Sequence, residues 1–230
     1  MTRAANARLA GFAYIFYIVV AFPAMVLEGR ATAGRDMAAR LANVAQHAPE
    51  LHLAAVLSLL GCFCAITLAV TTYAITRDVD ADLAMLSLAC RVAEGVVGGA
   101  GILTTLGLLS VATAAKENPA SVTSALPVGI LVLQQGGPLV AATFFAVGST
   151  IFASLLLRGR IVPVWLAWLG VASSMLIVVV LLMQLGGLMR GAISQLVWLP
   201  IAAFEIIVAF WLMIRGAAVP VQGAALRRAA

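Results

Sequence analysis

The chain has 230 residues, of which 63% are hydrophobic and 10% are charged, and its mean hydropathy is +1.10. A soluble domain is typically about 45–50% apolar and about 25% charged, and here the apolar residues form long blocks, so we predict an all-α, polytopic membrane protein rather than a soluble one. The net charge of +5 comes from basic residues scattered at the block ends, with no basic patch among aromatics, which argues against nucleic-acid binding.

Six apolar blocks indicate six transmembrane helices, and the bundle that they form is expected to occupy residues 1–216 as one domain. The first block is longer than the apolar part of a signal peptide, so we expect a retained helix although Ala31-Thr32-Ala33 resembles a cleavage site. Residues 217–230 have no apolar period and are predicted to be a disordered cytoplasmic tail. The predicted helices cover roughly residues 9–27, 51–76, 82–115, 138–157, 164–185 and 196–214.

The longest polar segment, residues 28–50, separates the first two blocks. Its apolar residues Met37, Leu41, Val44 and Ala45 share one helical face, which predicts a short amphipathic helix on the membrane surface. His47 and His52 flank a proline at a spacing that matches no standard metal-ligand pattern, so ordinary interfacial histidines are favoured over a metal site.

The fourth block is interrupted at residues 134–138 by Gln-Gln-Gly-Gly-Pro. Two glycines weaken a helix, and the proline lacks an amide donor and clashes with the carbonyl four residues earlier. We therefore predict a kink or break there, with the membrane-crossing part of this helix beginning near Pro138.

The basic residues predict the orientation of the bundle. Six helices place both termini on one side, and the cytoplasmic side of a membrane protein collects Lys and Arg. With the termini inside the cell, the cytoplasmic flanks hold Arg3, Arg8, Arg77, Arg158, Arg160, Arg215, Arg227 and Arg228, against Arg30, Arg35, Arg40, Lys116 and Arg190 outside. This bias favours cytoplasmic termini in the inner (plasma) membrane.

Three charges fall inside the apolar blocks, and each costs at least about 2.5–3.5 kcal/mol at membrane depth unless it is paired or hydrated. At 1.5 Å per residue, Arg91 and Glu94 lie about 13 and 18 Å along the helix from Asp82, and Glu205 lies about 15 Å from Arg215. The three charges are therefore at nearly one level, and we predict that Arg91 pairs with Glu94 or Glu205 inside the bundle. Hydroxyl groups fall near the same level, and the candidate polar site comprises Arg91, Glu94, Glu205, Tyr17, Ser173 and Ser174.

These charged and hydroxyl side chains at one level form a polar layer, and a purely structural role for this layer is an alternative to a function. Arg91 and Glu94 are spaced i,i+3 and can satisfy each other, and Ser and Thr in membrane helices often bond their own backbone. The functional interpretation is a polar cavity on the route of a ligand, an ion or a proton.

Short motifs along nearly the whole chain resemble one family. Residues 7–14, Ala-Arg-Leu-Ala-Gly-Phe-Ala-Tyr, look like the opening A-R-x-A-G-x-x-Y of a bacterial family of six-helix membrane proteins that is catalogued as a domain of unknown function. Arg91-Val92-Ala93-Glu94 resembles its R-x-x-E on the third helix, and Pro200, Glu205 and residues 211–216 are similar to its closing P…E…W-L-x-x-x-G. The chain departs from the family at residues 134–137, where members often carry His or aromatic residues. The resemblance implies the six-helix fold and the charged residues as the site, and it implies no activity.

Two classes of function follow from these features. The polar layer favours a small transporter-like protein or a membrane binder of a small-molecule or lipid ligand. Gly95-x-x-x-Gly99, a spacing that lets helices approach closely, favours a structural or regulatory partner of another membrane protein, or a helix-mediated oligomer. Enzymatic motifs are absent and the three cysteines, in apolar runs, are expected to be buried thiols, so we expect no cofactor and lean against an enzyme.

Overall fold

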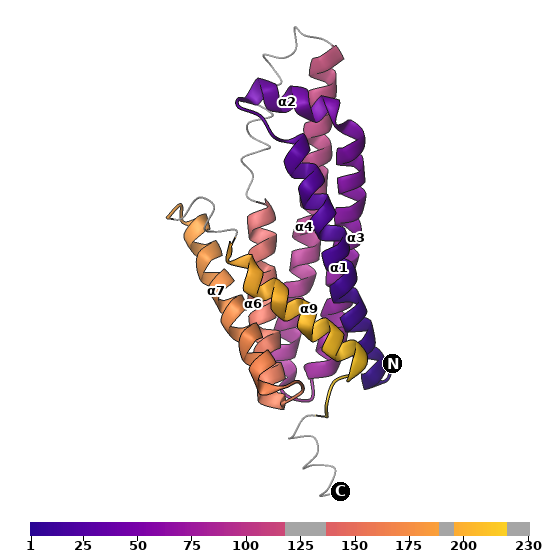
Figure 1. Ribbon diagram of the computed structural model, residues 1–230, viewed down its shortest axis with the longest axis vertical. Helices are drawn as coiled ribbons and strands as arrows, with labels where there is room; N and C mark the ends of the chain where they lie inside the picture. Colours follow the sequence, from indigo (N-terminus) through magenta and orange to yellow (C-terminus); the bar gives the residue numbers. More distant parts are fainter. Residues whose placement is uncertain (118–136, 189–195, 220–230) are drawn as a thin grey trace, which may run out of the picture. The chain divides into compact units, whose positions relative to one another are not determined.

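The computed structural model describes residues 1–117, 137–188 and 196–219, and every regular element in these ranges is an α-helix (Figure 1). The predicted all-α class is therefore confirmed for the described part of the chain. The helices are α1 (Arg3–Ala31), α2 (Met37–Gln46), α3 (Ala48–Thr76), α4 (Ala81–Glu117), α6 (Gly137–Gly159), α7 (Val164–Leu185) and α9 (Trp198–Ile214).

The helices mostly extend beyond the predicted blocks, because an apolar block does not include the capped ends of its helix. α1 begins at Arg3 rather than at residue 9, since the Thr2 hydroxyl accepts a hydrogen bond from the Ala5 amide at 3.2 Å and caps the first turn. α3 begins at Ala48 rather than at residue 51, because proline at position 49 is tolerated in the first turn of a helix. α7 has the predicted bounds.

Five helices are long and apolar enough to cross a membrane: α1, α3, α4, α6 from Pro138 onward, and α7. α9 is apolar as well but has only 17 residues. The chain is thus a helical membrane protein with several candidate spans, and the count of six remains a prediction. The predicted break at residues 134–138 falls largely outside the described residues, and α6 begins at its end, at Gly137.

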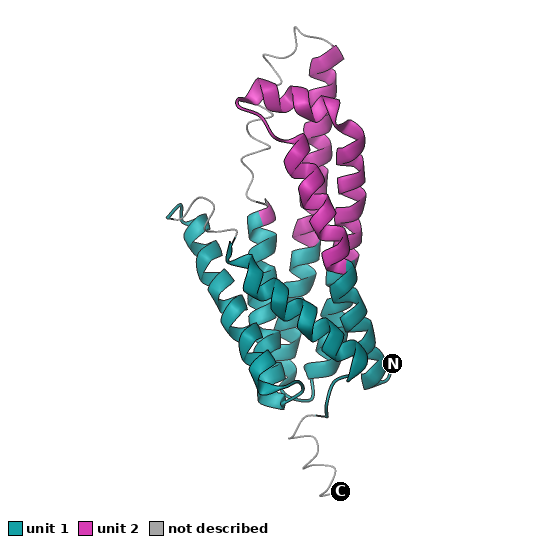
Figure 2. Cartoon of the chain, viewed as in Figure 1, with its two compact units in different colours: residues 1–16, 64–95, 139–230 teal, residues 17–63, 96–138 magenta. Residues whose placement is uncertain are grey.

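The chain contains two compact units (Figure 2). Unit 1 comprises residues 1–16, 64–95 and 139–230, and unit 2 comprises residues 17–63 and 96–138. α1, α3 and α4 each contribute residues to both units, because each crosses a unit boundary along its length. Residues 220–230 of the predicted tail lie outside the described part of the chain.

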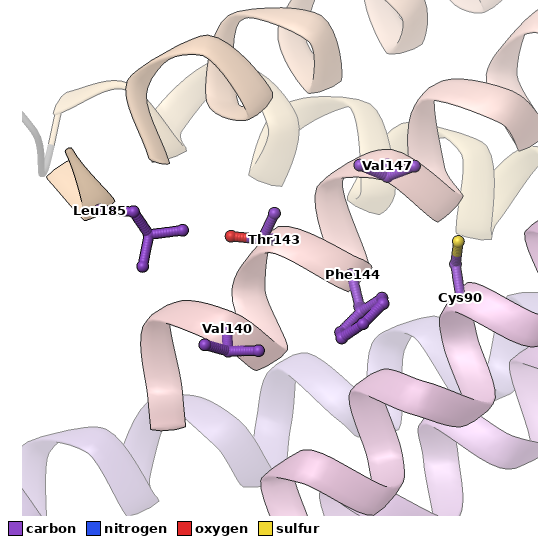
Figure 3. Close-up of a pocket in the computed structure, with 6 residues that line it drawn as sticks. All are labelled: Cys90, Val140, Thr143, Phe144, Val147 and Leu185. Carbon is purple, nitrogen blue, oxygen red and sulfur yellow. The ribbon is translucent and has the colours of Figure 1, made fainter. Parts of the chain in front are cut away.

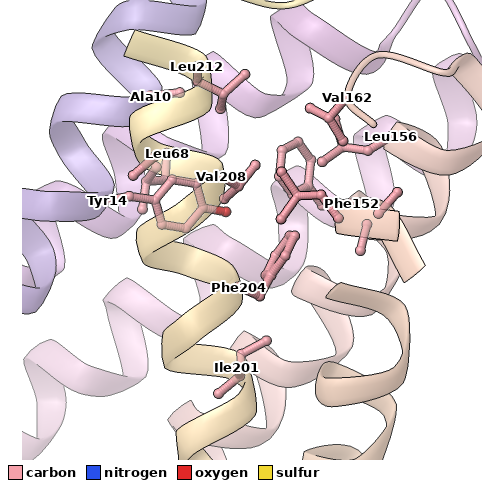
Figure 4. Close-up of a cluster of buried hydrophobic side chains, with 14 of the residues drawn as sticks. Ala10, Tyr14, Leu68, Phe152, Leu156, Val162, Ile201, Phe204, Val208 and Leu212 are labelled. Carbon is pink, nitrogen blue, oxygen red and sulfur yellow. The ribbon is translucent and has the colours of Figure 1, made fainter. Parts of the chain in front are cut away.

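The core of unit 1 is built around α9, whose residues Phe204, Val208 and Leu212 are buried along one side (Figure 4). Tyr14 of α1 and Phe152 of α6 belong to the same buried cluster. The spacing of four between the α9 residues places them on one helical face, which turns this face toward the rest of the unit.

Two glycines let α9 approach its neighbours closely. A Cβ atom at Gly11 of α1 would lie 2.5 Å from the carbonyl oxygen of Ala209, and one at Gly170 of α7 would lie 2.5 Å from the ring of Phe204. Real Cβ atoms essentially never come this near to another heavy atom, so any side chain at either position requires α9 or its ring to shift. The two glycines therefore fix the distance of α9 from α1 and α7, and with it the position of Glu205.

Unit 2 has its own core, and α2 is fastened to it. Leu41 and Val44, two of the four residues predicted to share an apolar face, are buried in this core. The Asn43 side-chain amide donates to the carbonyl oxygens of Arg30 at 2.7 Å and Ala31 at 3.1 Å. These are carbonyls of the last turn of α1, which have no partner within the helix, so Asn43 holds α2 across the end of α1.

Candidate functional site

The site centres on Arg91, whose side chain is only 2% exposed. Arg91 Nη1 lies 3.0 Å from Oε2 of Glu94, one turn further along α4, and this contact is a hydrogen-bonded ion pair. Arg91 Nη2 lies 3.6 Å from Oε1 of Glu205 on α9. Both carboxylate side chains are less than a tenth exposed. The prediction that Arg91 pairs with Glu94 or Glu205 in the interior is confirmed, and the guanidinium contacts both.

Two hydroxyl groups also accept hydrogen bonds from the guanidinium. Arg91 Nη2 donates to Ser149 Oγ of α6 at 3.2 Å and to the Tyr14 hydroxyl of α1 at 3.3 Å. A guanidinium Nη carries two hydrogens, so these two bonds use the full donor capacity of Nη2. This explains why Glu205 Oε1 is near Nη2 without a hydrogen bond: within the described part of the chain, that buried oxygen has no hydrogen-bond partner. We call Arg91, Glu94, Glu205, Tyr14 and Ser149 the charged cluster.

Aromatic rings cover the cation. The Arg91 Cζ atom lies 4.7 Å from the centre of the Phe145 ring and 5.7 Å from that of Tyr14. The negative faces of aromatic rings attract a cation, and the attraction is strongest where water is excluded. The cation is therefore held by residues of four helices, α1, α4, α6 and α9, and all of these residues belong to unit 1.

The crossing of α4 and α6 places Ser149 beside Arg91. The Ser87 hydroxyl donates to the carbonyl oxygen of Gly148 at 3.0 Å, which ties the two helices together. A Cβ atom at Gly148 would lie 3.0 Å from the Cβ of Cys90, so the backbone of α6 at Gly148 packs directly against the side chain of Cys90 on α4. Small residues allow such close approach in membrane bundles, and here the approach puts the residue after Gly148 next to the residue after Cys90.

The other predicted site residues lie elsewhere. Ser173 and Ser174 are buried in α7, and each hydroxyl donates to a carbonyl of its own helix, at 2.6 Å from Leu169 and Gly170 respectively. They follow the structural interpretation, in which a helical Ser bonds its own backbone. Tyr17 belongs to unit 2, where its ring would be 3.4 Å from a Cβ at Gly61.

Sequence reasoning did not single out Tyr14 and Ser149 as members of the site. Tyr14 and Tyr17 are about 4.5 Å apart along a helix axis, so a count of depth does not distinguish them. A sequence signal for Tyr14 does exist, because it is the last residue of the opening motif at residues 7–14. Ser149 falls at the same level as the charges, and only its helix neighbours decide that it faces Arg91.

Unit 1 also contains an apolar pocket, whose lining includes no residue of the charged cluster (Figure 3). Its volume is about 220 Å³, and Thr143 is the only hydroxyl residue among those that line it. Cys90 and Phe144 on its wall precede Arg91 and Phe145 in the sequence, so adjacent residues of α4 and α6 serve the pocket and the cluster separately. The lining is Cys90, Val140, Thr143, Phe144, Val147 and Leu185.

Residues 1–117, 137–188 and 196–219 hold no group of three His, Cys, Asp or Glu side chains placed to bind a metal. None of the three cysteines, all of which lie within these ranges, forms a disulfide; Cys64 and Cys90 are buried and Cys62 is half-buried. His47 Nδ1 lies 2.9 Å from the carbonyl oxygen of Asn43, one turn earlier at the end of α2, so this histidine has a local partner.

A family model described as a domain of unknown function, DUF4386, matches residues 9–216. The chain belongs to the DUF4386 family. The match covers all the described helices of this DUF4386 chain apart from the first turns of α1, and it includes every charged residue of the cluster. No curated protein and no solved structure matches the chain.

Proposed function

We propose that this DUF4386 protein is a small transporter-like membrane protein, or a membrane binder of a small-molecule or lipid ligand, whose site is the charged cluster. The observation that carries the proposal is the buried guanidinium of Arg91 between carboxylates of two different helices. Ionisable groups at membrane depth are rare and mostly mark ligand, ion or proton routes. A pair needed only for packing is complete with Arg91 and Glu94 on one helix, whereas Glu205 adds a second carboxylate that this pairing does not require.

The surfaces of the helices support a place in the bilayer. α7 exposes Trp165 and Trp168 near its start and Met175, Val179 and Leu182 further along. Soluble proteins rarely expose contiguous apolar surface of this extent, and tryptophans at one end of a span suit the headgroup level. We include α9 as a sixth span, since its 17 residues rise about 25 Å, which is at the lower end of the lengths that cross a bilayer. We place α2 at the membrane surface and both termini on the cytoplasmic side of the inner membrane.

Reporter fusions test this topology. Fusions after Val79 and at Ala230 are expected to report the cytoplasm, and a fusion after Gly34 the opposite side, because six spans return the chain to its starting side. The measurement is the activity of a reporter that works on one side only, such as alkaline phosphatase outside and a fluorescent protein inside. A phosphatase signal at Ala230 contradicts either the even number of spans or the orientation.

Bound molecules test the proposed function. The protein is purified from its own membrane, and the small molecules and lipids extracted from it are identified by mass spectrometry. We expect at least one compound to be recovered with the wild type and to be depleted at least tenfold in Glu205→Gln, a substitution that keeps the side chain's size and replaces its ionisable carboxyl group by a neutral amide. Transport of that compound into liposomes then separates a transporter from a binder.

The matched control is Glu117→Gln, which removes one carboxylate from the exposed end of α4. This variant is expected to retain the compound at the wild-type level. Equal recovery from wild type, Glu205→Gln and Glu117→Gln contradicts the proposal and leaves the cluster as a packing device, which is the expectation for a structural or regulatory subunit of another membrane protein.

A further inference from the structure

The charged cluster has an unequal count of charges. It contains one guanidinium, that of Arg91, and two carboxylates, those of Glu94 and Glu205. An unbalanced charge in a medium of low dielectric is costly, and a buried carboxylate avoids the cost by taking up a proton. An arginine has no such option, since its guanidinium stays charged in proteins.

Among the described residues of unit 1, Arg91 is the one cation that forms an ion pair with Glu205. α7 has no charged residue at all, α9 has only Glu205, and the part of α3 in unit 1 has none before its end at Thr76. α6 faces the cluster with Ser149 and Phe145, which are neutral. Two further titratable groups lie at the cluster: Tyr14 of α1, which is part of it, and Cys90 of α4, which precedes Arg91 in the sequence, and both are neutral when protonated.

The hydrogen bonds distinguish the two carboxylates. Glu94 accepts a direct hydrogen bond from Arg91 at 3.0 Å, and a carboxylate that accepts such a bond is stabilised in its charged form. Glu205 Oε1 lies 3.6 Å from the guanidinium, has no hydrogen-bond donor in the described part of the chain, and is shielded from solvent. Of the two, Glu205 is the carboxylate whose charge the protein supports less.

We propose that Glu205 is an exchangeable proton-binding site, which holds the one proton that balances Arg91 against Glu94 and Glu205. A proton fits the place better than a metal cation, because the Arg91 guanidinium, 3.6 Å from Oε1, repels a second centre of positive charge. The inference rests on the proposed function of the charged cluster. It adds that the binding of a ligand at this site is coupled to the binding of a proton.

Infrared difference spectroscopy of the purified protein in lipid nanodiscs tests the proposal without any ligand. At neutral pH the exposed carboxyl groups are ionised, so the carbonyl stretch of a protonated carboxylic acid reports a buried proton. We expect this band in the wild type, with a shift on labelling with carbon-13 glutamate that assigns it to Glu, and a loss of the band as the pH is raised. Glu117→Gln is expected to keep the band.

Two substitutions at the cluster are expected to abolish the band. Glu205→Gln removes the carboxyl that carries the proton, and Glu94→Gln leaves one guanidinium with one carboxylate, so Glu205 then gives up its proton to pair with Arg91. The absence of the band from the wild type, its persistence in either variant, or its removal by sodium or potassium ions at constant pH overturns the proposal. These results are independent of the recovery of bound compounds, so the proton site and the ligand site fail or hold separately.

Discussion

Replacing Arg91 by methionine is expected to lower the free energy of unfolding of the protein by about 3–5 kcal/mol, because it leaves the buried carboxyl groups of Glu94 and Glu205 without their cation. Methionine has a similar length and is apolar, so the loss measures the missing charge and hydrogen bonds rather than a large cavity. The measurement is the thermal unfolding midpoint in detergent, followed by circular dichroism. Arg8→Met, which removes an exposed arginine of α1 in the same unit, is the control and is expected to leave the midpoint almost unchanged.

A triple replacement then separates a structural cluster from a functional one. Arg91→Met, Glu94→Gln and Glu205→Leu together remove all three ionisable groups, and replacing a buried ion pair by apolar groups is often neutral or even stabilising. We expect the triple variant to regain most of the stability lost by Arg91→Met while losing the bound compound and any transport. A triple variant that is stable and still retains the compound contradicts a role of the cluster in binding.

Gly11→Ala is expected to destabilise the protein by about 1–3 kcal/mol through overpacking. The added Cβ would lie 2.5 Å from the Ala209 carbonyl oxygen and 3.1 Å from the Met213 backbone nitrogen, and backbone atoms of a helix cannot move aside as a side chain does. α1 and α9 must therefore separate, which also moves Tyr14 relative to Glu205. Thermal unfolding measures the loss, and a weaker carboxylic-acid band at neutral pH reports the disturbed cluster.

Gly29→Ala is the matched control, because it makes the same change on the same helix. No described atom lies within 4 Å of a Cβ at Gly29, and alanine is a better helix former than glycine by up to about 1 kcal/mol. This variant is expected to be as stable as the wild type or slightly more so. A similar loss in both variants contradicts a close crossing of α1 and α9 and points to a general sensitivity of α1.

The sequence alone determined the class of the protein and the axial position of its charges. Long apolar blocks admit only helices in a bilayer, since every backbone polar group must then be satisfied within its own segment. The rise of 1.5 Å per residue placed Arg91, Glu94 and Glu205 at one level before any contact was known. The amphipathic spacing of Leu41 and Val44 likewise indicated which side of α2 is buried.

Only the tertiary structure decided which polar side chains meet. Rise along an axis gives the depth of a residue, but the rotation of each helix about its axis is set by packing, here by the close approach at Gly11, Gly148 and Gly170. That rotation turns Tyr14 to Arg91 and brings Ser149 into the cluster, while Ser173 and Ser174 bond their own helix. It also leaves Oε1 of Glu205 beside the guanidinium without a hydrogen bond, because the donors of Arg91 Nη2 point to two hydroxyl groups that lie nearer.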